Sequence, residues 1–400
     1  MSEKLQTLPI GTYHFEKLRR MDCLYVDKSA RLMELVEAGA WYFLSRPRRF
    51  GKSLTLSTLD AMFQGKAELF KGLAAEAWVA EQAKRPAPVL RLDMSTMDTR
   101  GVSEFETSLI RELTRRAERA GVHIESVLPG GVFQDLITGL YDQGGPVVVL
   151  IDEYDKPILD KIGDLAAAET MRGALRGFYT VLKGCDEYLR FVMLTGISKF
   201  TKTGVFSAMN NLRDISMVEE FGDIVGYTQE ELERDFSDWI DDAAGKMGFS
   251  RQELLMRMKD YYDGFCFDGR TRLYNPFSIL NFLADRKFKN YWYHSGSPTF
   301  ILSYLRSHGI DDPEVYRHKS VPADFADSQE IERAKPESFL FQSGYLTIES
   351  AEGQELTLDY PNREVLDSIS RLYLDNVYRV EGFTALGSNL WRALKDGDIE

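Results

Sequence analysis

The segment LSRPRRFGKS, residues 44–53, limits the folds open to this chain more than any other stretch. It ends in Gly51-Lys52-Ser53, as phosphate-binding loops do. In such loops, N–H groups at a strand-to-helix turn converge on phosphate, the lysine reaches its oxygens, and the hydroxyl binds Mg²⁺. The apolar run WYFLS (41–45) predicts a strand before the loop, and LTLSTLDAMFQG predicts an amphipathic helix after it. The beginning of the loop departs from the usual pattern, because Arg46 stands where a glycine is expected.

A second motif, VVVLIDEYD at residues 147–155, bears on whether this is a nucleotide site or a basic loop. The tripeptide GKS alone does not separate these alternatives. The motif predicts a buried strand that ends in Asp152 and Glu153. An acid at this end of a central strand can hold the hydration shell of Mg²⁺, and its neighbour can orient or deprotonate water. Acids at strand ends are often only surface residues, but together with the loop this pair favours a nucleotide site.

The next apolar run, RFVMLTGISKF, offers two polar residues near its end, Thr195 and Ser198. In hydrolysing phosphate-loop proteins, a polar residue at this place senses the γ-phosphate. A turn or capping hydroxyl is the alternative for either residue. We take Thr195 as the candidate.

The distribution of apolar runs predicts the fold class. Runs that are apolar throughout alternate with helical patterns in the first half, as expected for strands buried on both faces. They occupy residues 41–45, 89–94, 147–152 and 190–196. The prediction is an α/β fold, with a P-loop NTPase parallel sheet and helices on both of its faces.

The pattern changes near residue 226. Thr228 and Glu231 form a capping-box signature, and a mostly helical stretch follows. YLTIES (345–350) and ELTLDY (355–360) then predict a hairpin, so this part is expected to be winged-helix-like. The predicted domains are residues 1–225, 226–360 and 361–400.

Composition excludes several classes of protein. With 49 basic and 62 acidic residues, the net charge of −13 argues against a general nucleic-acid coat. No secretory signal is visible at the start, and the most apolar stretch is too short for a membrane span. The three cysteines are isolated and the histidines lack ligand spacing. We expect a cytoplasmic protein with no membrane partner.

Motifs spread over nearly the whole chain carry a resemblance to a known family. They are LPIGTYHFEKLRRMDCLYVDKS (8–29), YFLSRPRRFGKS (42–53), VVVLIDEYDKPI (147–158), LRFVMLTGISKF (189–200), GYTQEEL (226–232), YYDGFCF (261–267), YNPFSILNFL (274–283), YWYHSGSPTFI (291–301) and FLFQSGYLTI (339–348). The chain resembles the AAA-ATPase-like proteins of bacteria and archaea that are usually fused to a PD-(D/E)XK nuclease-like domain. In that family the loop reads RPRRFGKS, so Arg46 belongs to the family's form of the loop.

The resemblance implies a set of site residues. ATP would be bound by the loop residues Arg46, Pro47, Arg48, Arg49, Phe50, Gly51, Lys52, Ser53 and Leu54. Lys52 and Ser53 would bind phosphate and Mg²⁺, Asp152 would coordinate Mg²⁺, and Glu153 would be the general base. The segment around Phe15, Tyr25 and Asp27 would lie near the base, with plain core packing as the alternative.

The arginines of the loop are candidates for charge stabilisation. A guanidinium near the γ-phosphate stabilises the transition state, while pairing with surface acids is the alternative reading. Among Arg46, Arg48 and Arg49 we take Arg49 as the catalytic candidate. Arg176 and Arg213 are further candidates for an arginine finger.

The nuclease half of the family pattern is missing from these residues. Its D-x-K signature is matched only by Asp285-Arg286-Lys287, in a helical stretch with no acidic strand before it, so we reject that match. We expect a truncated nuclease-like domain from residue 361, with its catalytic acids beyond residue 400.

These observations predict an Mg²⁺-dependent ATP-binding and ATP-hydrolysing module that regulates an attached effector, a DNA nuclease. The alternative is a nucleotide-gated switch or scaffold with negligible turnover. The remaining expected partners are DNA, reached through the missing domain, and further copies of the chain. Direct DNA contact through the hairpin is disfavoured, because its tip reads ESAEGQE and is acidic.

Overall fold

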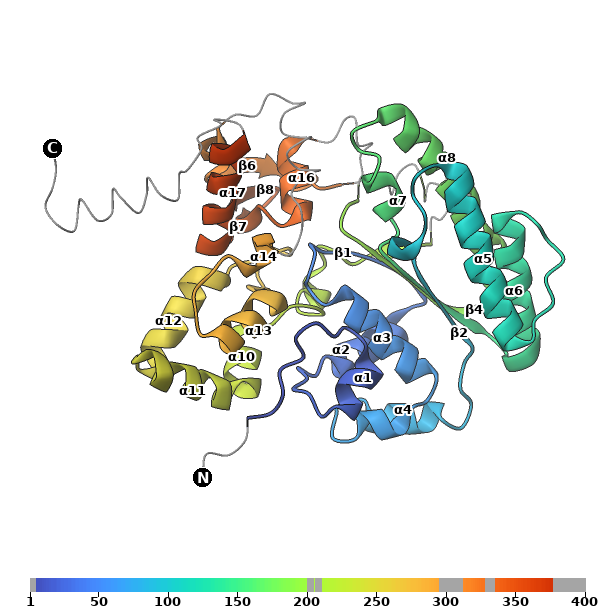
Figure 1. Ribbon diagram of the computed structural model, residues 1–400, viewed down its shortest axis with the longest axis horizontal. Helices are drawn as coiled ribbons and strands as arrows, with labels where there is room; N and C mark the ends of the chain where they lie inside the picture. Colours follow the sequence, from blue (N-terminus) through green and yellow to red (C-terminus); the bar gives the residue numbers. More distant parts are fainter. Residues whose placement is uncertain (1–4, 200–204, 206–210, 295–311, 328–334, 377–400) are drawn as a thin grey trace, which may run out of the picture.

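The computed structural model describes residues 5–199, 205, 211–294, 312–327 and 335–376 (Figure 1). Five parallel strands form the central sheet in the order β2-β3-β4-β1-β5. Their bounds are β1 Trp41–Ser45, β2 Val89–Asp93, β3 Val147–Asp152, β4 Leu189–Gly196 and β5 Arg213–Asp214. The four predicted strands are confirmed to within one residue at either end, and only the short edge strand β5 was not predicted.

Helices cover both faces of the sheet, which confirms the predicted P-loop NTPase architecture (Figure 1). Trp41 and Phe43 face the helices α5 Val102–Ala120, α6 Pro129–Gly144 and α8 Leu165–Gly184. Tyr42 and Leu44 face the opposite layer, which comprises α1 Phe15–Arg20, α2 Ser29–Ala38, α3 Lys52–Phe63 and α4 Glu76–Gln82. Alternate side chains of β1 therefore enter two different cores, as expected for a strand buried on both faces. The short α7 Lys156–Leu159 follows β3.

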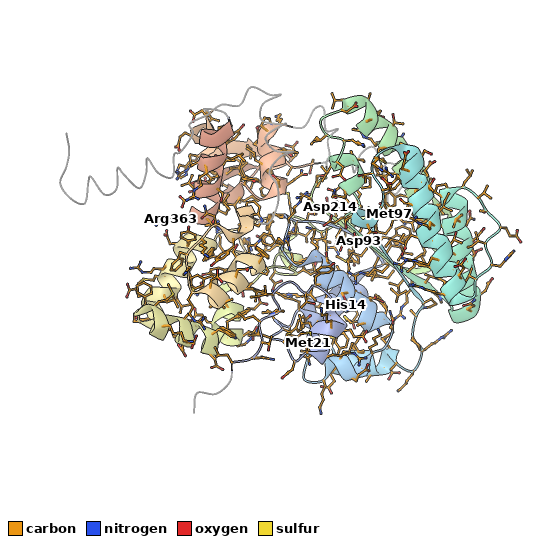
Figure 2. The ribbon with its side chains drawn as sticks, in the orientation of Figure 1. His14, Met21, Asp93, Met97, Asp214 and Arg363 are labelled. Carbon is orange, nitrogen blue, oxygen red and sulfur yellow. The ribbon has the colours of Figure 1, made fainter. Side chains whose placement is uncertain are left out.

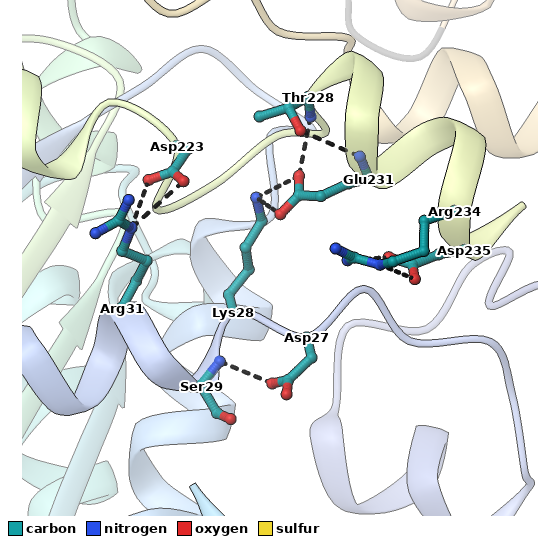
Figure 3. A network of polar contacts seen from close by, with 9 residues as sticks. All are labelled: Asp27, Lys28, Ser29, Arg31, Asp223, Thr228, Glu231, Arg234 and Asp235. Carbon is teal, nitrogen blue, oxygen red and sulfur yellow. Dashed lines mark hydrogen bonds and ion pairs between the residues drawn. The ribbon is translucent and has the colours of Figure 1, made fainter. Parts of the chain in front are cut away.

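The helical part begins at the predicted capping box, which the structure confirms. Glu231 N–H donates to Thr228 Oγ1 at 3.2 Å, and Thr228 N–H donates to Glu231 Oε2 at 2.9 Å. Lys28 Nζ also lies 2.6 Å from both oxygens of Glu231, and Arg31 pairs with Asp223 nearby (Figure 3). These contacts fasten the helical part to the N-terminal segment. Its helices are α10 Gln229–Asp235, α11 Ser237–Met247, α12 Arg251–Tyr262, α13 Pro276–Asp285 and α14 Tyr291–His294.

A small antiparallel sheet, β6-β8-β7, follows the helices. The predicted hairpin is confirmed as β7 Thr347–Glu352 and β8 Glu355–Asp359, with Gly353 at a φ of 61° in its turn. Its third strand, β6 Lys319–Pro322, pairs with β8, and the unit also contains α16 Pro336–Ser343 and α17 Arg363–Asn376. The end of the predicted nuclease-like segment, residues 377–400, lies outside the described residues.

Short 3₁₀ helices complete the described chain, at Ala67–Phe70, Met94–Thr96, Asp186–Tyr188, Glu219–Phe221 and Pro313–Tyr316. Among the helices that the structure describes, none combines the length and apolarity needed to cross a bilayer.

Candidate functional site

The loop between β1 and α3 has a backbone that few sequences adopt. Arg49 and Gly51 both have positive φ angles, 68° and 100°, which turn the chain sharply before α3 begins at Lys52. Glycine adopts this conformation without the steric cost that other residues incur. The first N–H groups of a helix have no partner within the helix and carry its positive end. A turn of this geometry can therefore hold an anion at the edge of the sheet.

A cavity of about 460 Å³ opens in front of this loop, within the range of small-molecule sites. Its lining combines polar and charged residues with apolar ones. The polar and charged residues are Arg48, Arg49, Lys52, Ser53, Asp93, Asp152, Glu153 and Lys156. The largely apolar residues are Pro9, Ile10, Tyr13, Leu18, Tyr227, Pro276, Phe277 and Leu280. Three segments distant in sequence thus build one site: the N-terminal stretch, the sheet edge and the start of α13.

Lys52 lines the cavity and is almost completely buried. Its Nζ donates to the carbonyls of Arg46 at 2.8 Å and Pro47 at 2.9 Å. Burial lowers the pKa of Lys52, and the charges of Glu153 and Asp152 act against that shift. A phosphate oxygen is a stronger, charged acceptor than a carbonyl, so it can replace these two contacts.

Asp152 and Thr195 lie side by side at the ends of neighbouring strands. The buried Thr195 hydroxyl donates to Asp152 Oδ1 at 2.6 Å, and Glu153 N–H donates to the same oxygen at 3.1 Å. Thr195 is not among the residues that line the cavity. Its hydroxyl orients the Asp152 carboxylate, and its contact with the γ-phosphate stays a prediction.

Glu153 has two features that are typical of functional residues. Its φ is 49°, a strained value for a residue other than glycine, and strain of this kind gathers at active sites. Burial raises the pKa of its carboxyl, while the charge of Lys52 acts in the opposite direction. A raised pKa makes a carboxylate a more effective proton acceptor.

Two further acids belong to this region and were missed in the sequence. Asp93 lies near the middle of the molecule (Figure 2), opposite Asp152 in the β2–β3 pairing, and lines the cavity. It ends a predicted strand just as Asp152 does, so the rule applied to β3 would have found it. Asp155 is buried instead, and its Oδ2 accepts from the N–H groups of Ile197 and Ser198 at 3.0 and 2.7 Å.

Arg46 lies behind the loop and not in the cavity. Its guanidinium donates to the carbonyls of Ser45 at 3.0 Å and Ser216 at 2.5 Å, and lies 4.5 Å from the centre of the Phe267 ring. Burial lowers the pKa of Arg46 to about 10. Pro47 and Phe50 likewise do not line this cavity. The arginine that replaces the usual glycine therefore supports the loop from its far side.

Arg48 and Arg49 do line the cavity, and both contact the helical part. The Arg49 guanidinium lies 4.7 Å from the centre of the Phe277 ring, and Trp292 Nε1–H donates to the Arg48 carbonyl at 3.2 Å. The other finger candidates are elsewhere. Arg213 in β5 pairs with Glu220, while Arg176 belongs to α8, and neither lines the cavity.

The N-terminal residues predicted to lie near the base are divided. Tyr25 lines a smaller apolar cavity of about 60 Å³ that shares Pro9, Leu18, Gly51, Leu54, Tyr227 and Pro276 with the main one. Phe15 is buried in the core, and Asp27 accepts hydrogen bonds from the N–H groups of Ser29 and Ala74. Phe15 thus packs in the core, and Asp27 positions the backbone of two neighbouring segments.

A parallel sheet with a loop of this kind, a buried lysine and an acidic pair at its carboxyl edge defines the class of phosphate-loop NTPase folds. Residues 9–206 match the family described as "Predicted AAA-ATPase". A protein of Azotobacter chroococcum mcd 1, described as "Uncharacterized protein in vnfD 5'region", is 36% identical over 374 residues, which are 92% of this chain and 70% of that protein. The chain belongs to the AAA-ATPase-like family.

Two solved structures are distantly similar to the chain. They are the Aeropyrum pernix ORC1 protein in complex with DNA and CDC6p from Pyrobaculum aerophilum, each with a TM-score of 0.31 and 11% identity. The alignments cover 88% and 94% of this chain, and 94% and 96% of theirs. Similarity at that level supports no conclusion about this chain.

Proposed function

We propose that this chain is an Mg²⁺-dependent module that binds and hydrolyses ATP and thereby regulates an attached effector. One observation carries the proposal: Lys52, Ser53 and the acidic pair Asp152–Glu153 converge on one cavity from the ends of separate elements. Family membership supports ATP as the nucleotide. The sequence resemblance supports a DNA nuclease as the effector. Domain boundaries at residues 225 and 360, a winged-helix-like second domain and assembly into a homo-oligomer belong to the same proposal.

The lining residues that carry oxygen fit Mg²⁺, which prefers oxygen ligands and keeps several of its waters. Ser53, which carries a hydroxyl, and Asp152, which carries a carboxylate, both line the cavity. Within the described chain, the two hydrogen bonds to Asp152 end on Oδ1, which leaves Oδ2 for a hydrated ion. Bound Mg²⁺ would neutralise charge on the phosphate oxygens.

The side chains divide the work of hydrolysis. Glu153 orients the attacking water and accepts its proton, for which its raised pKa suits it. Lys52 leaves the carbonyls of its own loop to contact the phosphates, and Arg49 adds positive charge to the lining of the cavity. The apolar lining residues, among them the exposed Tyr13, receive the base.

Phosphate release from ATP and Mg²⁺ tests the proposal. We expect turnover by the wild-type chain and its loss in both Lys52→Ala and Glu153→Gln. Lys84→Ala is the matched control, since Lys84 is exposed and pairs only with Glu81, three residues before it, among the described residues. Turnover that persists in Glu153→Gln would contradict its role as the base.

A switch with negligible turnover is the second candidate. It is favoured by the contacts of the helical part with Arg48 and Arg49. A loop held from outside can report occupancy without hydrolysis. For this candidate we expect no turnover, with ATP binding lost in Lys52→Ala and kept in Glu153→Gln. Phosphate release measured beside equilibrium binding of a fluorescent ATP analogue separates the two, because both candidates bind ATP and only the first hydrolyses it.

A further inference from the structure

Two helices outside the sheet touch the phosphate loop at adjacent residues. Trp292, in α14, donates its indole N–H to the Arg48 carbonyl at 3.2 Å. Phe277, in α13, lies under the Arg49 guanidinium at 4.7 Å. Arg48 and Arg49 also line the cavity. A phosphate that enters the cavity therefore meets residues that are already in contact with both helices.

Glu364 joins these same two helices through its carboxylate. Oε1 accepts from the backbone N–H of Trp292 at 2.8 Å, and Oε2 accepts from the hydroxyl of Ser278 at 2.7 Å. Ser278 follows Phe277 directly in α13. Glu364 is fully buried, and a buried carboxylate is costly unless such bonds satisfy it. Both of its oxygens thus serve the elements that hold the loop.

Glu364 lies in the first turn of α17, the last helix of the described chain. The rest of that helix is seated in the core by Val365, Ile369 and Leu372. An unbroken series of contacts therefore runs from the cavity to α17: the Arg48 carbonyl, the indole of Trp292, its backbone N–H and the Glu364 carboxylate. The Arg49–Phe277–Ser278 side reaches the same carboxylate independently.

We propose that Trp292 and Glu364 couple occupancy of the nucleotide cavity to the start of α17, and so regulate the site. The inference rests on the proposed function, because it assigns the route by which bound nucleotide acts on the C-terminal part. When Lys52 exchanges the Arg46 and Pro47 carbonyls for phosphate, the loop backbone shifts and Trp292 follows the Arg48 carbonyl. Coupling of this kind is reciprocal, so a constraint on α17 changes nucleotide affinity by the same factor.

Hydrogen–deuterium exchange of the full chain, with and without a non-hydrolysable ATP analogue and Mg²⁺, tests the coupling. In the wild type we expect slower exchange both in the loop, residues 46–54, and at the start of α17, residues 363–369. Trp292→Phe removes the indole donor and keeps an aromatic ring. We expect it to keep the loop protection, to lose the response of α17, and to weaken binding by no more than about tenfold, the limit for one neutral hydrogen bond.

Trp239→Phe is the matched control. Its indole also donates to a backbone carbonyl, that of Gln6 at 2.9 Å, but it does not line the cavity. We expect this variant to respond like the wild type. Ser278→Ala removes only the bond from α13 and gives a second measurement if Trp292→Phe does not fold, with a weakened response in α17.

The outcomes separate the two proposals. Absence of nucleotide binding and of loop protection in the wild type would overturn the proposed function together with the coupling. Loop protection with an unchanged α17 would overturn the coupling alone. An α17 response that persists in both Trp292→Phe and Ser278→Ala would also overturn it.

Discussion

Replacing Glu364 by glutamine is expected to remove a pH dependence from the stability of this protein. Burial raises the pKa of the Glu364 carboxyl from its ordinary 4.5 to about 7, against the effect of its hydrogen bonds from Trp292 and Ser278. The folded state then holds the proton more tightly than the unfolded chain does. Its contribution to stability is therefore complete below pH 4.5 and is lost as the pH rises through about 7.

The size of the effect follows from the two pKa values. One pKa unit corresponds to about 1.4 kcal/mol, so between about pH 5 and about pH 8 the wild type loses roughly 2–3 kcal/mol through this carboxyl. Glutamine does not titrate. Its amide oxygen still accepts from Trp292 N–H, and its NH₂ group donates to the Ser278 hydroxyl. The variant should therefore gain roughly 2–3 kcal/mol relative to the wild type over that range.

Urea unfolding, followed by tryptophan fluorescence at several pH values across this range, measures the difference. Other titrating groups are common to both proteins and cancel in the comparison. Glu104→Gln is the matched control, because Glu104 is an exposed acid in the first turn of α5. Curves of unfolding free energy against pH that run parallel for wild type and Glu364→Gln would refute the reasoning.

Three further predictions concern the loop, the metal ligand and the N-terminal contact. Gly51→Ala should abolish nucleotide binding and cost about 1–2 kcal/mol of stability, because any side chain is strained at its φ of 100°, even though a Cβ there meets no atom within 4 Å. Binding titrations and thermal melts measure the two effects, and an unchanged affinity would contradict the prediction. Thr195→Val should raise the Mg²⁺ concentration needed for half-maximal phosphate release several-fold, because Asp152 loses the hydrogen bond that orients it, while the melting temperature changes little. An Mg²⁺ dependence equal to that of the wild type would exclude an orienting role for Thr195. Lys28→Met should destabilise the chain by about 3 kcal/mol, because the largely buried Glu231 loses its cation. Lys28→Met/Glu231→Gln should recover part of the loss in urea unfolding, and no recovery would argue against the pair.

The parts of this protein that were predicted correctly depend on local patterns. The strand–loop–helix of residues 41–63, the acidic end of β3, the capping box at Thr228 and the hairpin are each specified by neighbours in the chain. Residue type and spacing are enough there, because apolar runs, caps and turns act over a few residues.

The missed features depend on contacts across long stretches of sequence. Arg46 stands in a phosphate loop, but its direction is set by Ser216 and Phe267, far along the chain. The contact of Thr195 with the γ-phosphate stays a prediction, but its hydrogen bond to Asp152 was not expected, because only the β3–β4 pairing brings these two strand ends together. The bonds of Glu364 to α13 and α14 have no signal in a single sequence either.

Phe50 shows what the packing behind the loop means for the chain as a folding unit. Its ring lies 4.9 Å from that of Phe265 and 5.5 Å from that of Phe267, and all three belong to a core that continues to Tyr373. A fragment cut after residue 225 would expose that aromatic cluster to water. Proteolysis is therefore expected to release no stable N-terminal fragment. We expect residues 9–206, the segment that matches the family, to unfold together with the helices behind it.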